Sequence, residues 1–136
     1  MTRRGLSALI AGLAASGALW LGAPASAPAD KAAGLDEVIH ANNRGAALME
    51  QYKHAQAIEE FKKVTTGAPG WAPGFVNLGL AEFYARDPAG AGSAFSEAAR
   101  LDPGVPQASY GLALVLKNEG KTAEAIAALE KVRARP

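Results

Sequence analysis

The sequence of 136 residues contains no cysteine. Disulfide bonds, thiol catalysis, thiolate zinc sites and covalent haem attachment are therefore all excluded. An excess of charge of one sign is missing too, because 14 basic side chains are set against 13 acidic ones, for a formal net charge of +1. Domains that bind nucleic acid usually carry a basic stripe or patch. We therefore expect no nucleic-acid partner.

Side chains that carry chemistry are also scarce. The only two histidines, His40 and His54, have no acidic companion at metal-binding spacing, and we expect both to be solvated. The neighbouring carboxylates Glu59 and Glu60 would point about 100° apart on a helix and do not converge. "GAGSAF" (residues 90–95) lacks the last glycine of a phosphate-binding loop. The sequence therefore predicts a protein that is not an enzyme and needs no cofactor or metal.

Long apolar runs occur only near the N-terminus. Two arginines precede an uncharged apolar run (residues 6–21), and small residues follow it. These are the three parts of a secretory signal peptide. Cleavage sites of the Ala-x-Ala type end at Ala25 and at Ala29, and we favour the second. Residues 1–29 are therefore predicted to be a cleaved signal peptide, which would make the mature protein periplasmic or secreted.

Two other interpretations of this N-terminal segment stay open. It could be an uncleaved membrane anchor, although the apolar run is shorter than the roughly 20 residues that a spanning helix needs. The paired arginines also resemble a twin-arginine export signal, but the usual continuation is absent. After cleavage, the rest of the chain has nearly balanced charge, and we expect it to make no membrane contact.

The rest of the chain repeats itself with a period of 34 residues and no gaps. Small residues recur where two helices would have to approach closely, and large ones recur where one unit would meet the next. The aligned sets are Gly45, Gly79 and Ala113; Ala57, Ala91 and Ala125; Phe61, Phe95 and Leu129; and Pro69 with Pro103. A repeat of this length indicates a stack of similar helical units.

The second copy, residues 72–105, shows the clearest pattern. Its key residues are Phe75, Leu78, Gly79, Ala91, Phe95, Ala98 and Pro103. At these positions the chain resembles the tetratricopeptide repeat, a pair of antiparallel helices. The resemblance extends to a first copy over residues 38–71 and a third over 106–136, behind a lead over 30–37. It implies an all-α fold, a right-handed α-solenoid of three helix-turn-helix repeats.

Local signals place the helix boundaries. Asp87 before Pro88 is typical of a helix N-cap, and Gly/Pro-rich breaks occur at residues 67–73 and 102–106. In the second helix of the first copy, Ala57, Phe61 and Val64 should face inward and the charges outward. The sequence predicts about six antiparallel helices, at roughly 37–50, 53–66, 72–85, 88–100, 106–118 and 122–134.

The resemblance also implies a concave groove, lined by the first helix of each copy, that binds a peptide segment or a helix of a partner protein. The residues carried over to the groove are Asn42, Ala46, Met49, Glu50, Val76, Leu80, Phe83, Tyr84, Tyr110, Leu114, Lys117 and Asn118. Among them, Phe83, Tyr84, Tyr110 and Leu114 would form an aromatic and apolar cluster of the kind enriched in binding hot spots. The alternative is that Phe83 and Leu114 belong to the core.

Some tetratricopeptide proteins grip the C-terminal carboxylate of chaperones with lysine, arginine and asparagine side chains. The corresponding positions here hold Asn42, Ala46, Asn77, Gln107 and Gly111, of which only Asn77 matches. Without the cations, a bound carboxylate would not be neutralised. The sequence therefore argues against binding of chaperone tails and favours apolar contacts.

The third copy has no capping helix after it in this sequence. We expect its apolar side, including some of Leu112, Leu116, Ile126 and Leu129, to be partly exposed, which would favour self-association or a partner. The sequence thus predicts an exported adaptor or scaffold that binds a segment of an envelope protein. Its Ala- and Gly-rich composition suggests a bacterial source. The alternative is a structural protein that forms homo-oligomers through its last repeat.

Overall fold

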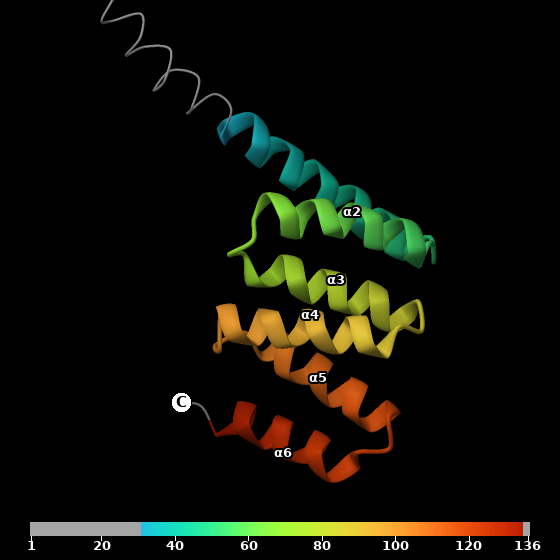
Figure 1. Cartoon of the computed structure of the whole chain (residues 1–136), viewed down its shortest axis with the longest axis vertical. Coiled ribbons are helices and arrows are strands. Elements are labelled where there is room, and N and C mark those ends of the chain that lie inside the picture. The colour runs from blue at the N-terminus through green and yellow to red at the C-terminus, as the bar shows by residue number, and fades with distance from the viewer. Residues whose placement is uncertain (1–30, 135–136) are drawn as a thin grey trace, which may run out of the picture. The chain divides into compact units, whose positions relative to one another are not determined.

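In the computed structural model of the chain, residues 31–134 are described. The chain divides into two compact units, and the repeats lie in the second one, Glu37–Pro136. Within that unit the helices stack in chain order, each beside the next (Figure 1). The predicted signal peptide, residues 1–29, lies outside the described residues.

The described part of the chain contains six helices and no strand. Residues 31–50 are helical, and the others are α2 (His54–Gly67), α3 (Ala72–Tyr84), α4 (Pro88–Leu101), α5 (Pro106–Asn118) and α6 (Thr122–Arg133). The all-α fold is confirmed, and α2 to α6 match the predicted ranges to within one residue at each end. Across residues 31–134 we find no helix long and apolar enough to cross a membrane.

The first helix is longer than the sequence predicted. Residues 31–36 are helical, whereas the sequence predicts a lead over 30–37 before the first helix. The segment "KAAGLD" consists mostly of good helix formers, and its single glycine costs only about 1 kcal/mol relative to alanine. No proline interrupts it, so the helical backbone extends into the predicted lead.

The start of α4 shows why the boundaries could be predicted. Asp87 is the N-cap, and its Oδ1 accepts a hydrogen bond from the backbone N–H of Gly90 at 3.0 Å. Pro88 then takes the first helical position, where no backbone N–H is needed. Helices α3 and α5 likewise have a proline in the first turn. The predicted cap is confirmed, and a proline marks the start of α3, α4 and α5.

The core consists of small residues packed against large rings. Phe61 and Val64 of α2 are 2% and 0% exposed, which confirms their predicted inward position. A Cβ atom added to Gly45 would lie 2.5 Å from Phe61 Cε1, and one added to Gly79 would lie 2.8 Å from Phe95 Cε1. The glycines therefore let the two helices of each pair approach closely, as the repeat pattern predicted.

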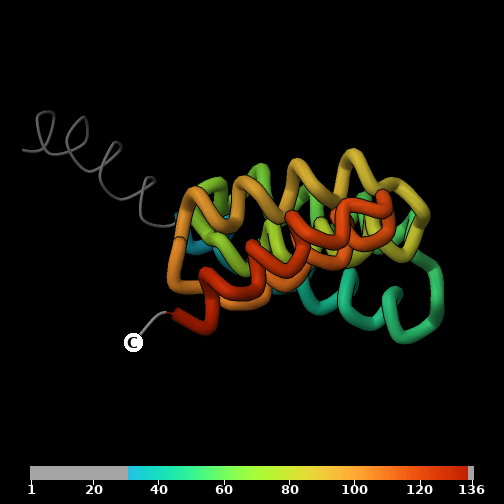
Figure 2. The backbone as a smooth tube through the Cα atoms, turned by 90° about the horizontal axis from the view of Figure 1, so that it is seen from below, coloured from blue at the N-terminus to red at the C-terminus, as the bar shows by residue number. Residues whose placement is uncertain are grey.

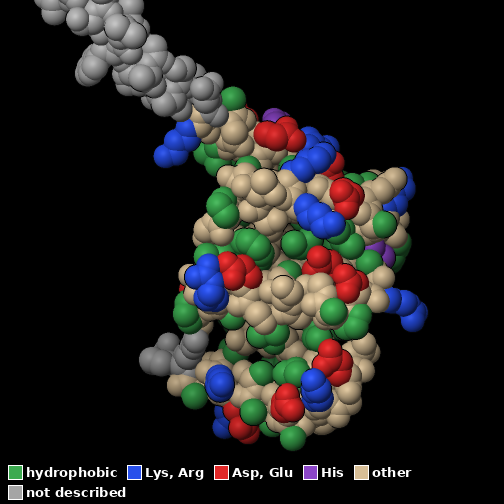
Figure 3. All heavy atoms as spheres, in the orientation of Figure 1, with side chains coloured by type: hydrophobic (Ala, Val, Ile, Leu, Met, Phe, Trp, Pro, Cys, Tyr) green, Lys and Arg blue, Asp and Glu red, His purple; other side chains and the backbone are tan. Residues whose placement is uncertain are grey.

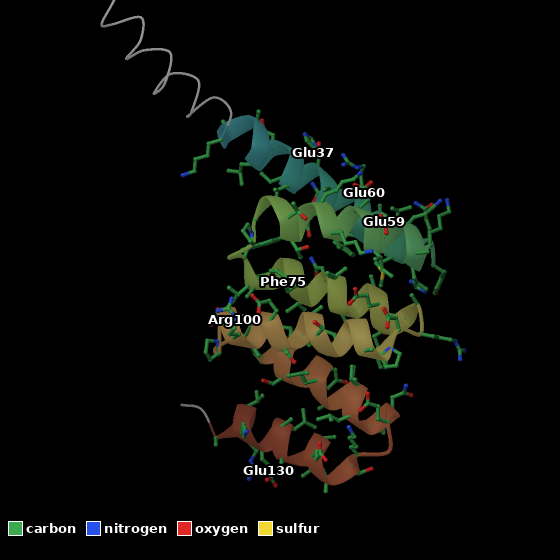
Figure 4. The ribbon with its side chains drawn as sticks, in the orientation of Figure 1. Glu37, Glu59, Glu60, Phe75, Arg100 and Glu130 are labelled. Carbon is green, nitrogen blue, oxygen red and sulfur yellow. The ribbon has the colours of Figure 1, made fainter. Side chains whose placement is uncertain are left out.

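Apart from the buried Glu82, the charged side chains of the described residues lie on the outside of the stack, with both signs interspersed on the face shown in Figure 3. Arg44 of the first helix donates hydrogen bonds to Glu37 at 2.7 Å and to Glu60 of α2 at 2.9 Å. Figure 4 shows Glu37 and Glu60 on these two adjacent helices. Lys63, then Arg44, hold the pKa of Glu60 below its usual range against the effect of desolvation. These exposed pairs stabilise the fold only slightly.

Candidate functional site

The first two repeats are joined by a neutral contact between their first helices. Asn77 Nδ2 of α3 donates a hydrogen bond to Asn42 Oδ1 at 2.9 Å, in half-buried surroundings. One of the two Nδ2 hydrogens of Asn77 is thereby used within the protein. This contact carries no net charge, so this part of the predicted groove offers no cation to a ligand.

Aromatic side chains gather where the turn after the first helix meets the end of α3. The His54 and Tyr84 rings stack, with centroids 5.6 Å apart and an interplanar angle of 25°. Tyr52 meets His54 edge-on at 6.2 Å, and Phe83 meets Tyr84 edge-on at 5.8 Å. Tyr52 and Tyr84 remain 84% and 58% exposed. We call these four residues the aromatic patch.

The turn that presents Tyr52 has an uncommon backbone conformation. Tyr52 has φ = 59° and Arg86 has φ = 64°, and Gly120, at the same place in the third repeat, has φ = 80°. The left-handed region costs a residue with a side chain roughly 1–2 kcal/mol. Only the third repeat avoids the cost by using glycine. A bulky, exposed tyrosine held at this cost is the kind of feature that recurs at functional sites.

The predicted groove residues differ in how accessible they are. Tyr84, Tyr110 and Lys117 are exposed, as are Ala46, Glu50 and Asn118; Asn42, Met49, Leu80, Phe83 and Leu114 are half-buried. Val76 is only 6% exposed and belongs to a core cluster with Ala108 and Val115 of α5. The prediction that Val76 faces a ligand is therefore wrong, because α5 packs over that part of α3.

The structure divides the predicted aromatic cluster. Tyr84 is the last residue of α3, whereas Tyr110 lies near the start of α5. The two helices run in the same direction (Figure 1). Since Tyr110 corresponds to Val76 in the repeat, it lies about 12 Å, or eight residues, before the end of its helix that matches Tyr84. Tyr110 and Leu114 instead line a hollow shared with α6.

Phe83 is both a core residue and part of the aromatic patch, the two roles that the sequence left open for it. It is half-buried and packs against the core cluster that contains Val76, and its ring also contacts Tyr84. The aromatic patch therefore combines Phe83 and Tyr84 of α3 with Tyr52, in the turn after the first helix, and His54, the first residue of α2. Tyr110 and Leu114 belong to a different surface.

Sequence reasoning missed Tyr52 and His54. His40 is exposed as expected, but His54 is half-buried, and its Nδ1 atom is buried with no hydrogen-bond partner among the described residues. The prediction of a solvated His54 is wrong because Tyr84 covers the ring. The alignment of Tyr52 with Gly120 was the available signal, since it places a tyrosine where the turn favours glycine. Within residues 31–134 no three His, Cys, Asp or Glu side chains are grouped so that they could hold a metal ion.

A separate hollow of about 570 Å³ lies between α3 and α4. Its walls include Phe75 and Arg100, which Figure 4 shows at the same end of these helices, and Glu82. Glu82 is 8% exposed, and its Oε2 atom has no hydrogen-bond partner within residues 31–134. Burial, followed by the nearby Asp87 carboxylate, raises the pKa of Glu82, and Lys62 opposes the shift. The charged form of this carboxyl group therefore destabilises the folded protein.

Known proteins that are similar to this chain contain the tetratricopeptide repeat that the sequence resembles. The sequence model of the tetratricopeptide repeat family matches residues 76–136. The Hsp70-Hsp90 organizing protein of Triticum aestivum is 33% identical over 72 residues, which is 53% of this chain and 12% of the relative. The chain thus spans about one eighth of that protein's length.

Solved structures show the same architecture. The second TPR of Spaghetti (RPAP3), bound to the HSP90 peptide SRMEEVD, has a TM-score of 0.68 at 22% identity and covers 74% of this chain and 94% of its own. The TPR2AB domain of yeast Sti1, in complex with an HSP90 peptide, has a TM-score of 0.71 at 19% identity, with 78% and 42% covered. MamA from Desulfovibrio magneticus RS-1 has a TM-score of 0.67 at 22% identity, with 70% and 54% covered.

These likenesses establish the class of the fold. The chain is an all-α stack of helix pairs with the architecture of tetratricopeptide repeat proteins, and its second half also matches the sequence model of that family. At these identities the structural likeness concerns the fold, and function has to be argued from the residues of this chain.

Proposed function

We propose that the protein is an exported, non-catalytic tetratricopeptide repeat adaptor that holds a segment of a partner protein against the aromatic patch. The observation that carries this proposal is the exposed ring of Tyr84, stacked on His54 and flanked by the exposed Tyr52. Tyrosine contributes a large, rigid contact area at low entropic cost, and it is enriched among hot spots.

The chemistry of the patch favours an apolar or aromatic ligand. Beside the patch, Asn42 and Asn77 bond each other, and Arg44, the nearest cation in sequence to Asn42, is engaged by two glutamates. The cations next to the patch residues in sequence, Lys53 and Arg86, are exposed. A carboxylate placed against the two asparagines would lose its hydration without gaining a cation. A segment with leucine, proline or aromatic side chains would instead bury its apolar surface on the exposed tyrosines.

Binding of a protein segment is supported by the neighbours in fold. Two of them, RPAP3 and yeast Sti1, are seen with an HSP90 peptide. The same architecture therefore presents a surface that fits a peptide. Our proposal differs in the ligand's chemistry, since the positions that would neutralise an acidic peptide are uncharged in this chain.

A photo-crosslinking experiment tests the proposal in intact cells. A photoreactive phenylalanine analogue replaces Tyr84, and a matched control carries it at Thr66, an exposed residue of α2. We expect one protein segment to be captured at position 84 and not at position 66. Adding Tyr52→Ala and His54→Ala should abolish capture while circular dichroism shows the helices intact. Capture of the same proteins from both positions would refute the assignment.

Export is tested separately. The signal peptide predicts that the purified protein begins at Asp30 and fractionates with the periplasm or the medium. N-terminal sequencing and cell fractionation measure both. Recovery of the intact N-terminus in the membrane fraction would support the anchor instead, and intact protein in the cytoplasm would refute export.

A further inference from the structure

The outer face of the third repeat is more exposed than the same face of the other two. Leu129 is 40% exposed, whereas the corresponding Phe95 and Phe61 are 0% and 2% exposed. Ile126 and Tyr110 on the same face are 52% and 57% exposed. Viewed from below, α6 is nearest to the viewer, and no helix within residues 31–134 covers it (Figure 2). We call this surface the C-terminal face.

The C-terminal face is hollowed along the seam between α5 and α6. One hollow of about 400 Å³ lies at the end of α6, and another of about 220 Å³ adjoins it; both are lined by Tyr110 and Leu129. Their walls are mostly apolar. The charged residues that line them are Arg133 in the first and Lys117 in the second. The face is therefore an apolar trough with one cation toward each end.

The repeat itself shows what kind of structure fits such a trough. On the second repeat the equivalent face is covered by α5, whose Gly111 lies against Phe95 and whose Ala108 and Val115 join the same core cluster. Helix α3 covers the first repeat in the same way. A face that is built for a helix twice in this chain has the shape to accept one a third time.

A second copy of this chain fits poorly. The residues of the first helix that correspond to the covering residues of α5 are His40, Asn43, Arg44 and Ala47, and all four are exposed. Three of them are polar, so docking this end onto the apolar trough would desolvate them without partners. Two C-terminal faces set against each other would also juxtapose the cations of both copies.

We propose that the C-terminal face binds an amphipathic helix of another protein, with small and aliphatic residues on its inner side and an acidic residue in its first and last turns. In the orientation of α5 on α4, the start of such a helix lies by the end of α6, near Arg133. Its end lies by the end of α5, near Lys117. Both cations occupy the last turns of their helices, so the two acids would each meet one of them.

A synthetic helix derived from α5 provides the probe. It comprises residues 104–118. Tyr110→Glu and Leu114→Lys, on the side of the peptide away from its α4-facing residues, are joined as a lactam that keeps the peptide helical. The acidic form carries Gln107→Glu and Lys117→Glu, and the matched basic form carries Gln107→Lys and keeps Lys117. Each labelled peptide is titrated with the purified full chain and followed by fluorescence anisotropy.

We expect saturable binding of the acidic peptide and at least about tenfold weaker binding of the basic one. The variant Ile126→Gln/Leu129→Gln should weaken binding about tenfold or more, because it removes two exposed aliphatic contacts. The control Ile39→Gln removes an aliphatic side chain that is 48% exposed elsewhere and should leave binding unchanged. In the protein variant Lys117→Glu/Arg133→Glu the preference should reverse toward the basic peptide.

Three results would overturn the proposal. The first is no binding of the acidic peptide, and the second is equal binding of both peptides. The third is a dimer of the chain that Ile126→Gln/Leu129→Gln dissociates in light scattering, since the occupant would then be a second copy. Crosslinking from position 84 concerns a different surface, so its result is independent of all three.

Discussion

The ring of Phe95 lies directly against Gly111, although the two residues belong to successive helix pairs. A Cβ atom added to Gly111 would overlap the ring, and the same ring also lies against Gly79 of its own pair. Phe95 is 0% exposed. One side chain therefore closes the second helix pair and at the same time seats the third pair on it.

Gly111→Ala should destabilise the protein even though alanine is the better helix former. The added methyl group forces the Phe95 ring or α5 to shift, and overpacking of this kind costs roughly 1–3 kcal/mol. The gain in helix propensity is only about 1 kcal/mol. We therefore expect the free energy of unfolding to fall by up to about 2 kcal/mol, measured by urea unfolding with far-UV circular dichroism.

The same substitution at Gly92 is the matched control. This glycine lies inside α4, and the nearest atom to an added Cβ would be Val115 Cγ1 at 3.7 Å, an ordinary contact. Gly92→Ala should therefore stabilise the protein by up to about 1 kcal/mol. A similar loss of stability in both variants would mean that the Phe95 contact is not the cause.

Substitutions at the two turn residues Arg86 and Gly120, which have positive φ, should change the free energy of unfolding in opposite directions. Arg86→Asn should raise the free energy of unfolding by about 0.5–1 kcal/mol, because asparagine tolerates the left-handed region better than arginine. Gly120→Ala should lower it by about 1–2 kcal/mol for the same reason. Thermal and urea unfolding of the two variants measure this. Equal and small effects would contradict the left-handed backbone at these turns.

The fold was predictable from sequence because its signals are local or strictly periodic. Glycine at positions 45 and 79 faces a phenylalanine 16 residues later in each pair, and Pro88 with Asp87 marks a helix start without reference to the rest of the chain. The extra helical turns before residue 37 were missed because no breaker or cap stands there to separate a lead from a helix.

The candidate site could not be predicted to the same degree. The contact between His54 and Tyr84 depends on how the turn of one repeat meets the end of the next repeat's first helix, and no pattern within one repeat fixes that distance. Val76 occupies a groove position in the repeat register, but α5 covers it. Tyr110 escapes such cover because no helix follows α6 among the described residues.

Glu82→Leu should stabilise the protein at neutral pH. The two other repeats carry Leu48 and Leu116 at this position. Glu82 instead buries a carboxylate oxygen that has no hydrogen-bond partner in the described part of the chain. An unsatisfied buried polar group costs about 1–3 kcal/mol, so we expect a gain of about that size in the free energy of unfolding. Glu82→Gln, which removes only the charge, should give a smaller gain. A loss of stability in the leucine variant would refute this account.

The stabilisation by Glu82→Leu should depend on pH. Burial raises the pKa of Glu82 in the folded protein above its ordinary value of 4.5, so the folded state binds this proton more tightly than the unfolded state does. The contribution of Glu82 to the stability of the wild-type protein is therefore most favourable below pH 4.5. It becomes less favourable as the pH rises to the pKa of Glu82 in the folded protein. The difference between variant and wild type should grow over that window and then level off. A difference that stays constant across the window would show that Glu82 does not titrate abnormally.

The HSP90 peptide SRMEEVD, which the second TPR of RPAP3 holds, should not bind this chain measurably. Asn42 and Asn77 are bonded to each other, and Gln107 is neutral. The position of Gly111 cannot accept a long cation, because the Phe95 ring already fills the space beside it. Each missing charge-assisted hydrogen bond is worth about 1.5–3 kcal/mol, so the loss of several weakens binding by a hundredfold or more, in order of magnitude. Fluorescence anisotropy of the labelled peptide measures the affinity, with the RPAP3 domain as the positive control. Similar affinities for the two proteins would contradict the prediction. They would mean that this chain neutralises the acidic tail with cations outside these positions.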